Sequence, residues 1–537
     1  MASTTELHDR YGWRQGADDT WSREADEVES FYAVFSRKRD SPEKAGFPIT
    51  ASASFQLDAS PSTPIETALR QAWIALRGEC PTLASSIQFD AEASKWKRVY
   101  RALPEGDASA ALDAWASDTF RTVRTALSPG EWFNTAPPTL PSAVLHLVLP
   151  ETEDTRGAVF LRCPHDLIDG HGLLQLIDRL FAIASAIQQG EVTPDTSHHK
   201  EDAALLAPPL RTAVDIAPVL SPDQQTRYDA VKMQAITSQM SLPALGLPVD
   251  LTKLNPANAG VKRVAAVLPP ATSTALLQKC KEQGLTPTHV LSAGLVLALR
   301  DLQDVKEGEE EKTLRYHTQA LVSLRDFFVK GENGVPGGVA MAAGNHHALA
   351  TTGLSRDFVV GAKDAVDDDE FLSVAKQFRE YYVSVKPARE NGVLSEAGRD
   401  ILDFTPHTWD MYTPKPPPTP PKTETEAGTK PADAPPAEPP KLPTSAPVAV
   451  SSIGNISSAV QADRKPFHIT GAWIAAEGMG PSIPVLVQTW EGRVGVSACF
   501  EGMFLAGADV QDFLGRILRT TTKGLGVTEE SEILSDW

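Results

Sequence analysis

The chain has 537 residues, of which 42% are hydrophobic and 22% charged, a composition typical of a globular protein with room for two or more domains. A formal net charge of −19 with no basic run argues against a nucleic-acid partner, because phosphate binding requires clustered Lys and Arg. No window reaches the ~20 apolar residues of a membrane span, and four scattered cysteines without CxxC spacing indicate neither a zinc finger nor a disulfide framework, so we expect a cytoplasmic protein.

The N-terminal part of the chain predicts alternating strands and helices. The run ITASASFQLDA over residues 49–59 predicts a strand, and the amphipathic stretch within residues 63–81 predicts a helix bounded by Pro and Gly. Two short apolar runs, over residues 143–150 and 157–164, are separated by a polar turn. They therefore predict a pair of neighbouring strands.

A second helix is predicted directly after this strand pair. Apolar residues recur at helical spacing from Leu173 to Ile187, so this helix should begin near His171 or Gly172. The polar residues of HDLIDG, numbered 165–170, therefore form a loop between a strand and a helix. Rigid elements on both sides hold such a loop, and this position suits catalytic groups.

Residues rich in Pro and Gly predict how the chain divides. Breakers cluster between residues 205 and 255, so we expect an N-terminal domain over 1–225, a connection over 226–255 and a C-terminal domain over 256–537. Residues 413–447 are more than a third proline with almost no large apolar side chains, and we expect a disordered surface loop there.

The loop after the strand pair offers two kinds of chemistry. An imidazole has a reference pKa of ~6.5, close to working pH, so His165 could serve as a general base. His165, Asp169 and His171 could instead hold a metal ion, but their spacing straddles the loop and the helix start, and no HExxH or CxxC supports this alternative. We therefore expect no metal site.

The string His165-Asp-Leu-Ile-Asp169-Gly170 resembles the HxxxDG motif of the coenzyme A-dependent acyltransferase superfamily. This superfamily includes chloramphenicol acetyltransferase, the plant BAHD acyltransferases and the condensation domains of peptide synthetases. The stretch ALVSLRDFF with Arg325, and the later Gly-Asn that contains Asn345, resemble further BAHD patterns in the expected order. The chain is most similar in pattern to fungal secondary-metabolite O-acetyltransferases of the trichothecene 15-O-acetyltransferase kind. Pro164 replaces the first His of the usual pair, and the BAHD motif DFGWG is absent.

The resemblance implies a role for each site residue. His165 would be the general base, and Asp169 would pair with Arg325 to hold the loop rather than relay a proton. Gly170 would permit the turn into the helix. Four residues would lie on the side of coenzyme A and substrate: Asn345, Ser452, Gly454 and Asn455.

The resemblance also implies an α/β fold with two chloramphenicol acetyltransferase-like domains, each a mixed β-sheet with flanking helices, and an active-site channel between them. The expected activity is transfer of an acyl group to a hydroxyl of a hydrophobic secondary metabolite, and the expected donor is acetyl-CoA. We expect the enzyme to be a monomer without a bound cofactor. Two alternatives stay open: a stand-alone condensation-type enzyme that uses a carrier-protein thioester, and a non-catalytic binding protein of the same fold. Activity with free acyl-CoA separates the first alternative from the expected function.

Overall fold

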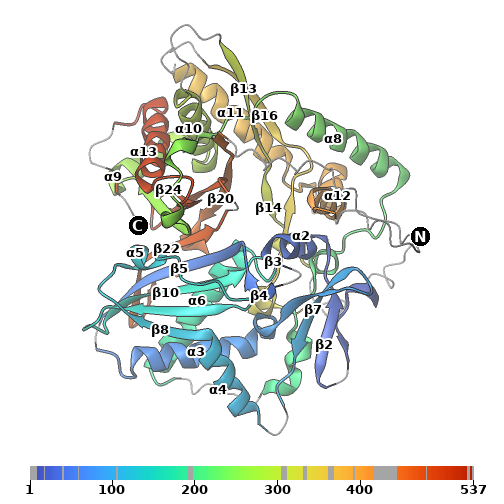
Figure 1. The fold of residues 1–537 in the computed structure, drawn as a ribbon, viewed down its shortest axis with the longest axis vertical. Helices are drawn as coiled ribbons and strands as arrows, with labels where there is room; N and C mark the ends of the chain where they lie inside the picture. Colours follow the sequence, from blue (N-terminus) through green and yellow to red (C-terminus); the bar gives the residue numbers. More distant parts are fainter. Residues whose placement is uncertain are drawn as a thin grey trace, which may run out of the picture.

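Two sheets with their helices form two bodies stacked along the long axis of the molecule (Figure 1). The computed structural model describes residues 9–16, 18–38, 41–58, 60–104, 107–191, 198–303, 311–329, 336–360, 368–390, 393–415, 444–478, 480–528 and 533–534. Residues 416–443 of the predicted Pro-rich loop lie outside these ranges.

A six-stranded sheet forms the lower body in Figure 1. Its strands, in spatial order, are β21 (Asp463–Arg464), β22 (Phe467–Ala476), β5 (Pro48–Leu57), β10 (Arg156–Pro164), β9 (Val144–Leu149) and β8 (Phe120–Arg124). β10 runs antiparallel to both β5 and β9, which confirms the predicted strand and strand pair. A large buried apolar cluster lies between this sheet and two helices, α3 (Ile65–Glu79) and α6 (Gly170–Gln188). Both helices confirm the sequence prediction, and α6 begins one residue earlier than expected.

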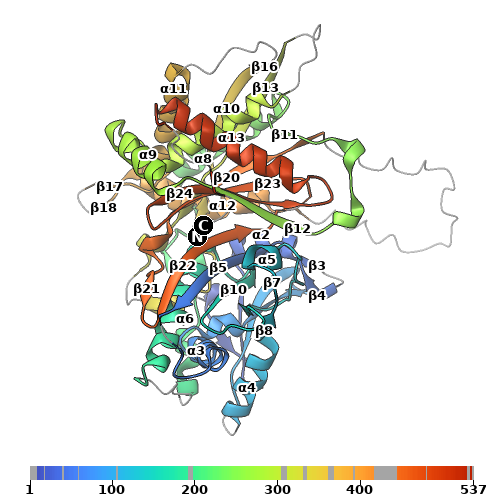
Figure 2. The ribbon, with the colours of Figure 1, turned by 90° about the vertical axis from the view of Figure 1, so that its left-hand side faces the viewer.

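A four-stranded sheet forms the centre of the upper body. Its order is β12 (Val261–Val267), β24 (Arg493–Glu501), β23 (Ile483–Trp490) and β20 (Val448–Asn455). One face carries helices that share an apolar core with the sheet (Figure 2): α9 (Pro270–Glu282), α10 (Pro287–Asp301), α11 (Asp368–Ser384) and α13 (Gly507–Gly524). Beyond them, β13 (Lys312–Thr318) pairs with β16 (Leu354–Val360).

The two bodies exchange chain segments. β21 and β22 come from the last part of the chain, yet they extend the lower sheet, and β22 pairs with β5 along its whole length (Figure 2). The chain then returns to the upper sheet through β23. The predicted domain limits stay a prediction. In the structure, strands from beyond residue 460 complete the lower sheet.

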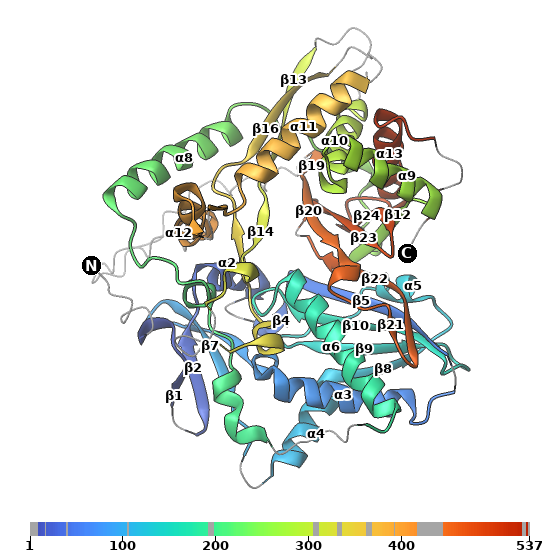
Figure 3. The ribbon, with the colours of Figure 1, turned by 180° about the vertical axis from the view of Figure 1, so that it is seen from behind.

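Smaller elements surround the junction of the two bodies. They include a four-stranded sheet, β1 (Arg14–Gln15), β2 (Thr20–Glu24), β7 (Lys95–Arg101) and β6 (Ser86–Asp90), and the strand pair β14 (Leu321–Ser323) and β15 (His347–Leu349). Three helices lie on the same side of the molecule (Figure 3): α2 (Glu27–Ser36), α8 (Pro222–Met240) and α12 (Glu396–Tyr412). The remaining short elements are β3 (Arg37–Lys38), β4 (Ser41–Ala45), α4 (Ala108–Thr119), α5 (Pro129–Phe133), α7 (Leu210–Ala213), β11 (Leu247–Pro248), β17 (Arg389–Glu390), β18 (Val393–Leu394) and β19 (Ser445–Ala446).

A buried ionic network fixes α2 to the lower body. Glu29 of α2 bonds Arg23 at 2.6 Å and Arg98 at 2.8 Å. Asp166, in the loop after β10, is bonded by the Nε atom of Arg37 at 3.1 Å and by the Oγ atom of Ser36 at 2.8 Å. Arg98 also donates to the backbone oxygen of Asp166, so one guanidinium joins α2 to the loop. Because each buried charge has an opposite partner, α2 has a defined position over that loop.

A buried carboxyl at the start of α2 makes stability depend on pH. Asp26 caps the helix by accepting the N–H of Glu29, and burial together with the charge of Glu29 raises the pKa of Asp26 to about 7. The folded protein therefore keeps this proton up to about pH 7, whereas the unfolded chain releases it near pH ~3.9. Stability is then lost as the pH rises between these two values.

We expect Asp26→Asn to increase the melting temperature at pH 8 relative to the unmodified protein, because Asn caps a helix as well as Asp and carries no charge. The advantage should be at least ~1 kcal/mol at pH 8 and should shrink toward pH 4. Thermal unfolding followed by circular dichroism across this range checks it. Asp250→Asn is the matched control, because Asp250 accepts the N–H of Thr252 on the surface and has a lowered pKa. Equal curves for Asp26→Asn and the unmodified protein at pH 4 and pH 8 would contradict the assignment.

Candidate active site

The loop between β10 and α6 is organised by the carboxylate of Asp169. Its Oδ1 atom accepts the N–H of Gly172 at 2.8 Å and caps α6, and the same oxygen accepts the Nη2 atom of Arg325 at 2.8 Å. Its Oδ2 atom accepts the N–H of His346 at 2.9 Å. Burial alone would raise the pKa of Asp169, but the Arg325 guanidinium and the side chain of His347 hold it well below its usual range. The carboxylate is therefore ionised and fully engaged by structural donors.

Arg325 extends this arrangement to a segment of the C-terminal half. Besides Asp169, it donates to the carbonyl oxygens of Met341 at 2.8 Å and Gly344 at 3.2 Å. The start of α6 fits tightly against the same segment, since a Cβ atom at Gly172 would lie 2.1 Å from the carbonyl oxygen of Ala342. The predicted contact between Asp169 and Arg325 is thus present.

Asn345 and Gly170, two further residues predicted at the site, both contribute to the structure of the loop and the start of α6. Asn345 is 2% exposed, and its Nδ2 atom donates to the backbone oxygen of His165 at 2.8 Å. Asn345 does not line the cavity described below, and the substrate-side role predicted for it stays a prediction. Gly170 is the first residue of α6, and a Cβ atom there would lie 3.3 Å from the side chain of Ile474, so the position favours a small residue.

The ring of His165 is buried and packs against other aromatic rings. Its side chain is buried, and its ring stacks on that of Tyr32 with a centroid distance of 4.0 Å and an interplanar angle of 8°. Phe47 lies 5.4 Å away and His347 6.4 Å away. Burial and the neighbouring His347 lower the pKa of His165 to about 4. The imidazole is therefore neutral at pH 7 and can accept a proton.

Tyr32 and His347 are site residues that the sequence does not reveal. The hydroxyl of Tyr32 lies 2.9 Å from the Nε2 atom of His347, whose Nδ1 atom lies 3.7 Å from the Oδ2 atom of Asp169. His346, the residue before β15, contacts a different ring, that of Phe328. Tyr32 is 133 positions before His165 in a helix whose apolar pattern is ordinary, and no motif marks it.

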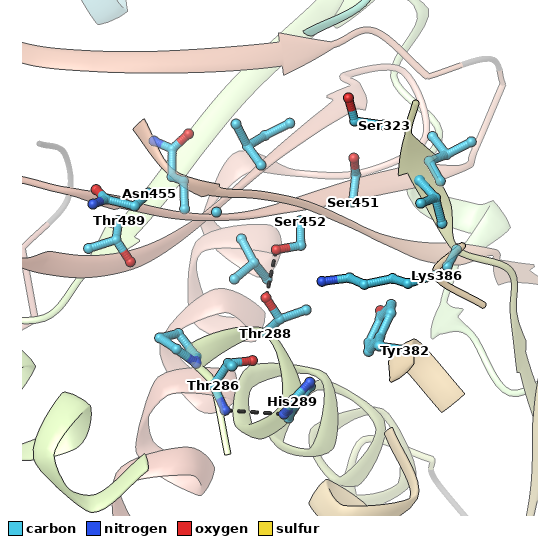
Figure 4. Close-up of a pocket in the computed structure, with 18 of the residues that line it drawn as sticks. Thr286, Thr288, His289, Ser323, Tyr382, Lys386, Ser451, Ser452, Asn455 and Thr489 are labelled. Atoms are coloured by element: carbon cyan, nitrogen blue, oxygen red, sulfur yellow. Dashed lines mark hydrogen bonds between the residues drawn. The ribbon is translucent and has the colours of Figure 1, made fainter. Parts of the chain in front are cut away.

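A large cavity opens beside the loop in the upper body. Its volume is about 1130 Å³, and its walls come from β14, β20, β23, the start of α10 and the end of α11 (Figure 4). Ser452, Gly454 and Asn455 line it, and their place on the substrate side stays a prediction. Gly454 lies at a bulge in the pairing of β20 with β23. The hydroxyls of Thr288 and Ser452 lie 2.7 Å apart in this wall.

His165 does not line this cavity. From the HxxxDG region, His171 reaches it, together with Asp326 and Phe327 of the short turn after β14. Phe327 belongs to two environments, because it lines the cavity and also packs against the aromatic cluster that contains Tyr32 and Trp409. The cavity and His165 are therefore neighbours through this aromatic cluster.

Charged and apolar side chains lie close together in one part of the cavity wall. Arg379, Tyr382 and Val383 lie in the last turns of α11, and Lys386 lies just after this helix. Figure 4 shows Lys386 extending toward Thr288 and Ser452. In the part of the chain that the structure describes, no ion pair involves Arg379 or Lys386. Leu321 and Val383 are 48% and 61% exposed, so the rim is apolar next to two cations.

Among the described residues, no three His, Cys, Asp or Glu side chains come together as a metal ion would need. Asp169 is occupied by Arg325 and backbone donors, and His171 points into the cavity whereas His165 stacks on Tyr32. Helices long and apolar enough to cross a membrane do not occur in the described parts of the chain.

Comparison with known proteins gives structural neighbours only. No family model matches the chain, and no curated protein matches its sequence. The trichothecene 15-O-acetyltransferase TRI3 from Fusarium sporotrichioides superposes with a TM-score of 0.68 at 15% identity, over 96% of this chain and 98% of that chain. The first condensation domain of the calcium-dependent antibiotic synthetase gives a TM-score of 0.56 at 14% identity, over 95% of this chain and 98% of that one.

The condensation domain of the Monacolin K polyketide synthase MokA also superposes, with a TM-score of 0.51 at 11% identity, over 94% of this chain and 96% of that chain. These likenesses cover nearly the whole chain, and they confirm the fold that the HxxxDG resemblance implies. The chain therefore has the two-domain α/β fold of the chloramphenicol acetyltransferase kind, shared with an O-acetyltransferase and with condensation domains.

Proposed function

We propose that this protein is an acyltransferase that moves an acyl group from its thioester with coenzyme A to a hydroxyl group, with His165 as general base. Acetyl-CoA is the proposed donor. The observation that carries the proposal is a neutral imidazole in a loop whose backbone is fixed on two sides. Asn345 holds the carbonyl of His165, and the Asp169–Arg325 pair holds the following turn. A base fixed in this way loses little entropy when it meets its substrate.

The reaction follows from the protonation state of His165. Its low pKa keeps the imidazole neutral, so it can take the hydroxyl proton as the oxygen attacks the thioester carbonyl. The resulting imidazolium then gives that proton to the departing thiolate when the carbon–sulfur bond breaks. No covalent bond to the protein forms. Asp169 takes no part in proton transfer, because its oxygens already accept three hydrogen bonds and its proton affinity is very low.

The cavity supports a donor that carries phosphate. Arg379 near the end of α11 and Lys386 just after that helix both line it, and coenzyme A presents phosphates at one end and a thioester at the other. The apolar rim of Leu321 and Val383 supports a hydrophobic acceptor. A condensation-type enzyme would use a carrier protein instead, and a binding protein would hold the ligand without turnover. Comparing metabolites of strains with and without this protein would identify both substrates through a lost acylated product.

Replacing the base should abolish turnover without unfolding the protein. We expect His165→Gln to lower kcat by ~10²–10⁴-fold, the usual loss when a general base is removed. Release of free thiol from acetyl-CoA, with the acceptor alcohol identified by the metabolite comparison, measures it. His146→Gln is the matched control, because His146 is equally buried, has a pKa lowered to about 4 and lies away from the site in β9. A kcat near normal in His165→Gln would remove the base role.

The Asp169–Arg325 pair should act as one structural unit. Asp169→Asn and Arg325→Gln should each lower the free energy of unfolding by ~3–5 kcal/mol, because each leaves a buried charge without its partner. The double variant should cost much less than the sum, and a double-mutant cycle from denaturant unfolding measures this difference. Additive costs would show that the pair is not an energetic unit. Full stability of Asp169→Asn with lost activity would instead make Asp169 part of a proton relay.

Arg379 and Lys386 should favour coenzyme A over pantetheine, the part of coenzyme A that carries the thiol but no phosphate. We expect the protein to bind CoA more tightly than pantetheine in calorimetry, and Arg379→Gln with Lys386→Gln to weaken CoA binding by about 10-fold, since partly exposed charge pairs contribute ~0.2–1 kcal/mol each. Pantetheine binding should not change. Arg519→Gln, a charge change on the outer helix α13, is the control. Equal binding of CoA and pantetheine by the unmodified protein would favour a carrier-protein donor.

A further inference from the structure

The start of α10 forms part of the cavity wall and carries a histidine that the proposed reaction does not use. Thr286 caps this helix, and Thr288 and His289 of its first turn line the cavity with it. His289 is 8% exposed, and Figure 4 shows its ring with Thr286 on one side and Tyr382 on the other. The start of a helix carries partial positive charge, which favours anions, but a binding site also needs side chains that face the ligand.

The backbone of α10 fixes the position of the proton on His289. Its Nδ1 atom accepts the N–H of Thr286 at 3.1 Å, so this nitrogen carries no proton. Burial lowers the pKa of His289 to about 4, and the ring is therefore neutral at pH 7 with its single proton on Nε2. Within the described residues, Nε2 has no hydrogen-bond partner. His289 thus offers an N–H donor, and no acceptor, to a ligand in the cavity.

The charges that act on His289 are both positive. Arg379 and Lys386 each disfavour its protonated form, and each lines the cavity. Lys386 extends toward the hydroxyls of Thr288 and Ser452, which lie 2.7 Å apart (Figure 4). This wall therefore combines two cations, a pair of hydroxyls and a fixed N–H donor at the start of a helix. Such a set of groups suits an oxyanion that has several acceptor oxygens.

The same cavity reaches the catalytic loop. His171, six positions after His165, lines it, and so does Asp326 of the turn after β14. A thioester donor in this cavity has its acyl group near the loop and its other end along the wall. In coenzyme A and in carrier proteins alike, a pantetheine arm joins the thiol to a phosphate. That 4′-phosphate is the oxyanion that both kinds of donor contain.

We propose that the start of α10, with His289 as donor and Lys386 as cation, is a phosphate subsite that binds the 4′-phosphate of a phosphopantetheine arm. The inference rests on the proposed function for the identity of the ligand, and it adds which group of the donor is recognised and by which side chain. His289 acts in binding and not as a base, because its neutral ring offers only an N–H to the cavity. The cations supply attraction, whereas the N–H supplies direction.

Calorimetry on the full-length protein tests the subsite, with 4′-phosphopantetheine and pantetheine as the probes. The unmodified protein should bind 4′-phosphopantetheine more tightly than pantetheine. His289→Phe should weaken the binding of 4′-phosphopantetheine by about 10-fold, the size of one hydrogen bond to a charged group, and should leave pantetheine binding unchanged. His407→Phe is the matched control, because His407 is a partly buried histidine of α12 that packs on Tyr228 and does not line the cavity.

A second pair of variants covers the case in which His289→Phe disturbs the start of α10. Gln and Glu at the third position of a helix both accept the N–H of a Thr cap, so His289→Gln and His289→Glu should both keep the helix start and the melting temperature. Only Gln also offers an N–H to the cavity. His289→Gln should therefore keep most of the preference for 4′-phosphopantetheine, and His289→Glu should remove it. Thr274→Glu, which adds the same charge at an exposed position of α9, should bind both probes as the unmodified protein does.

Two results would overturn the proposal. One is equal binding of 4′-phosphopantetheine and pantetheine by the unmodified protein, and the other is an unchanged preference in both His289→Phe and His289→Glu. A third probe, CoA, identifies the source of the phosphate: tighter binding of CoA than of 4′-phosphopantetheine indicates CoA, whereas equal binding indicates the arm of a carrier protein. The preference for phosphate, and hence the subsite, is supported in either case.

The proposed function is tested by a different measurement, the turnover of acetyl-CoA. A protein that prefers 4′-phosphopantetheine through His289 but does not turn over acetyl-CoA would keep the subsite and lose the acyl-CoA-dependent function. A protein that turns over acetyl-CoA, with kcat reduced in His165→Gln, but shows no preference for phosphate would lose only the subsite. The two proposals therefore fail independently.

Discussion

A single carboxylate joins the two halves of this chain at the site. Asp169 ends the loop after β10, caps α6, binds Arg325 and accepts the N–H of His346. Each of these donors belongs to a different segment, so the start of α6, the turn after β14 and the residue just before β15 meet at one buried negative charge. Such a charge is stable inside a protein only when its donors are all in place, and the surrounding segments therefore adopt one arrangement.

This arrangement explains why the acid of the motif and the candidate base have separate functions. In a proton relay, an acid orients the imidazole and shares its proton. Here the acid is saturated by Arg325 and backbone donors, and the imidazole lies against an aromatic ring. The loop is held by electrostatics, whereas the ring of His165 is held by packing. The apolar surroundings keep the imidazole neutral, which suits a group that must accept a proton at neutral pH.

The exchange of strands between the bodies places the cavity beside this loop. β20 and β23 form the cavity wall, and the strands between them in the chain, β21 and β22, complete the lower sheet. The lower sheet and the cavity wall are thus connected by a few residues of one chain segment. The bulge at Gly454 interrupts the β20–β23 pairing where the wall turns toward the lower body, and the positive φ angle of Gly454 suits that turn.

The sequence alone was sufficient for the local elements and for the fold. Strong periodicity predicted β5, α3, the β9–β10 pair and α6, because these segments each bury one face and their apolar residues repeat with the period of the element. The HxxxDG string and Arg325 predicted a contact across 156 positions, since a motif carries the geometry of relatives with it.

Tertiary structure decided which side chains surround His165. Tyr32 and His347 reach it from α2 and β15, and Asn345 turned out to support its backbone rather than to line the cavity. No periodicity or spacing encodes these neighbours, because they depend on how helices and strands pack from distant parts of the chain. The sequence determined that a histidine would lie between a strand and a helix, and only the packing of α2 over that loop decided that its ring would be buried, neutral and stacked.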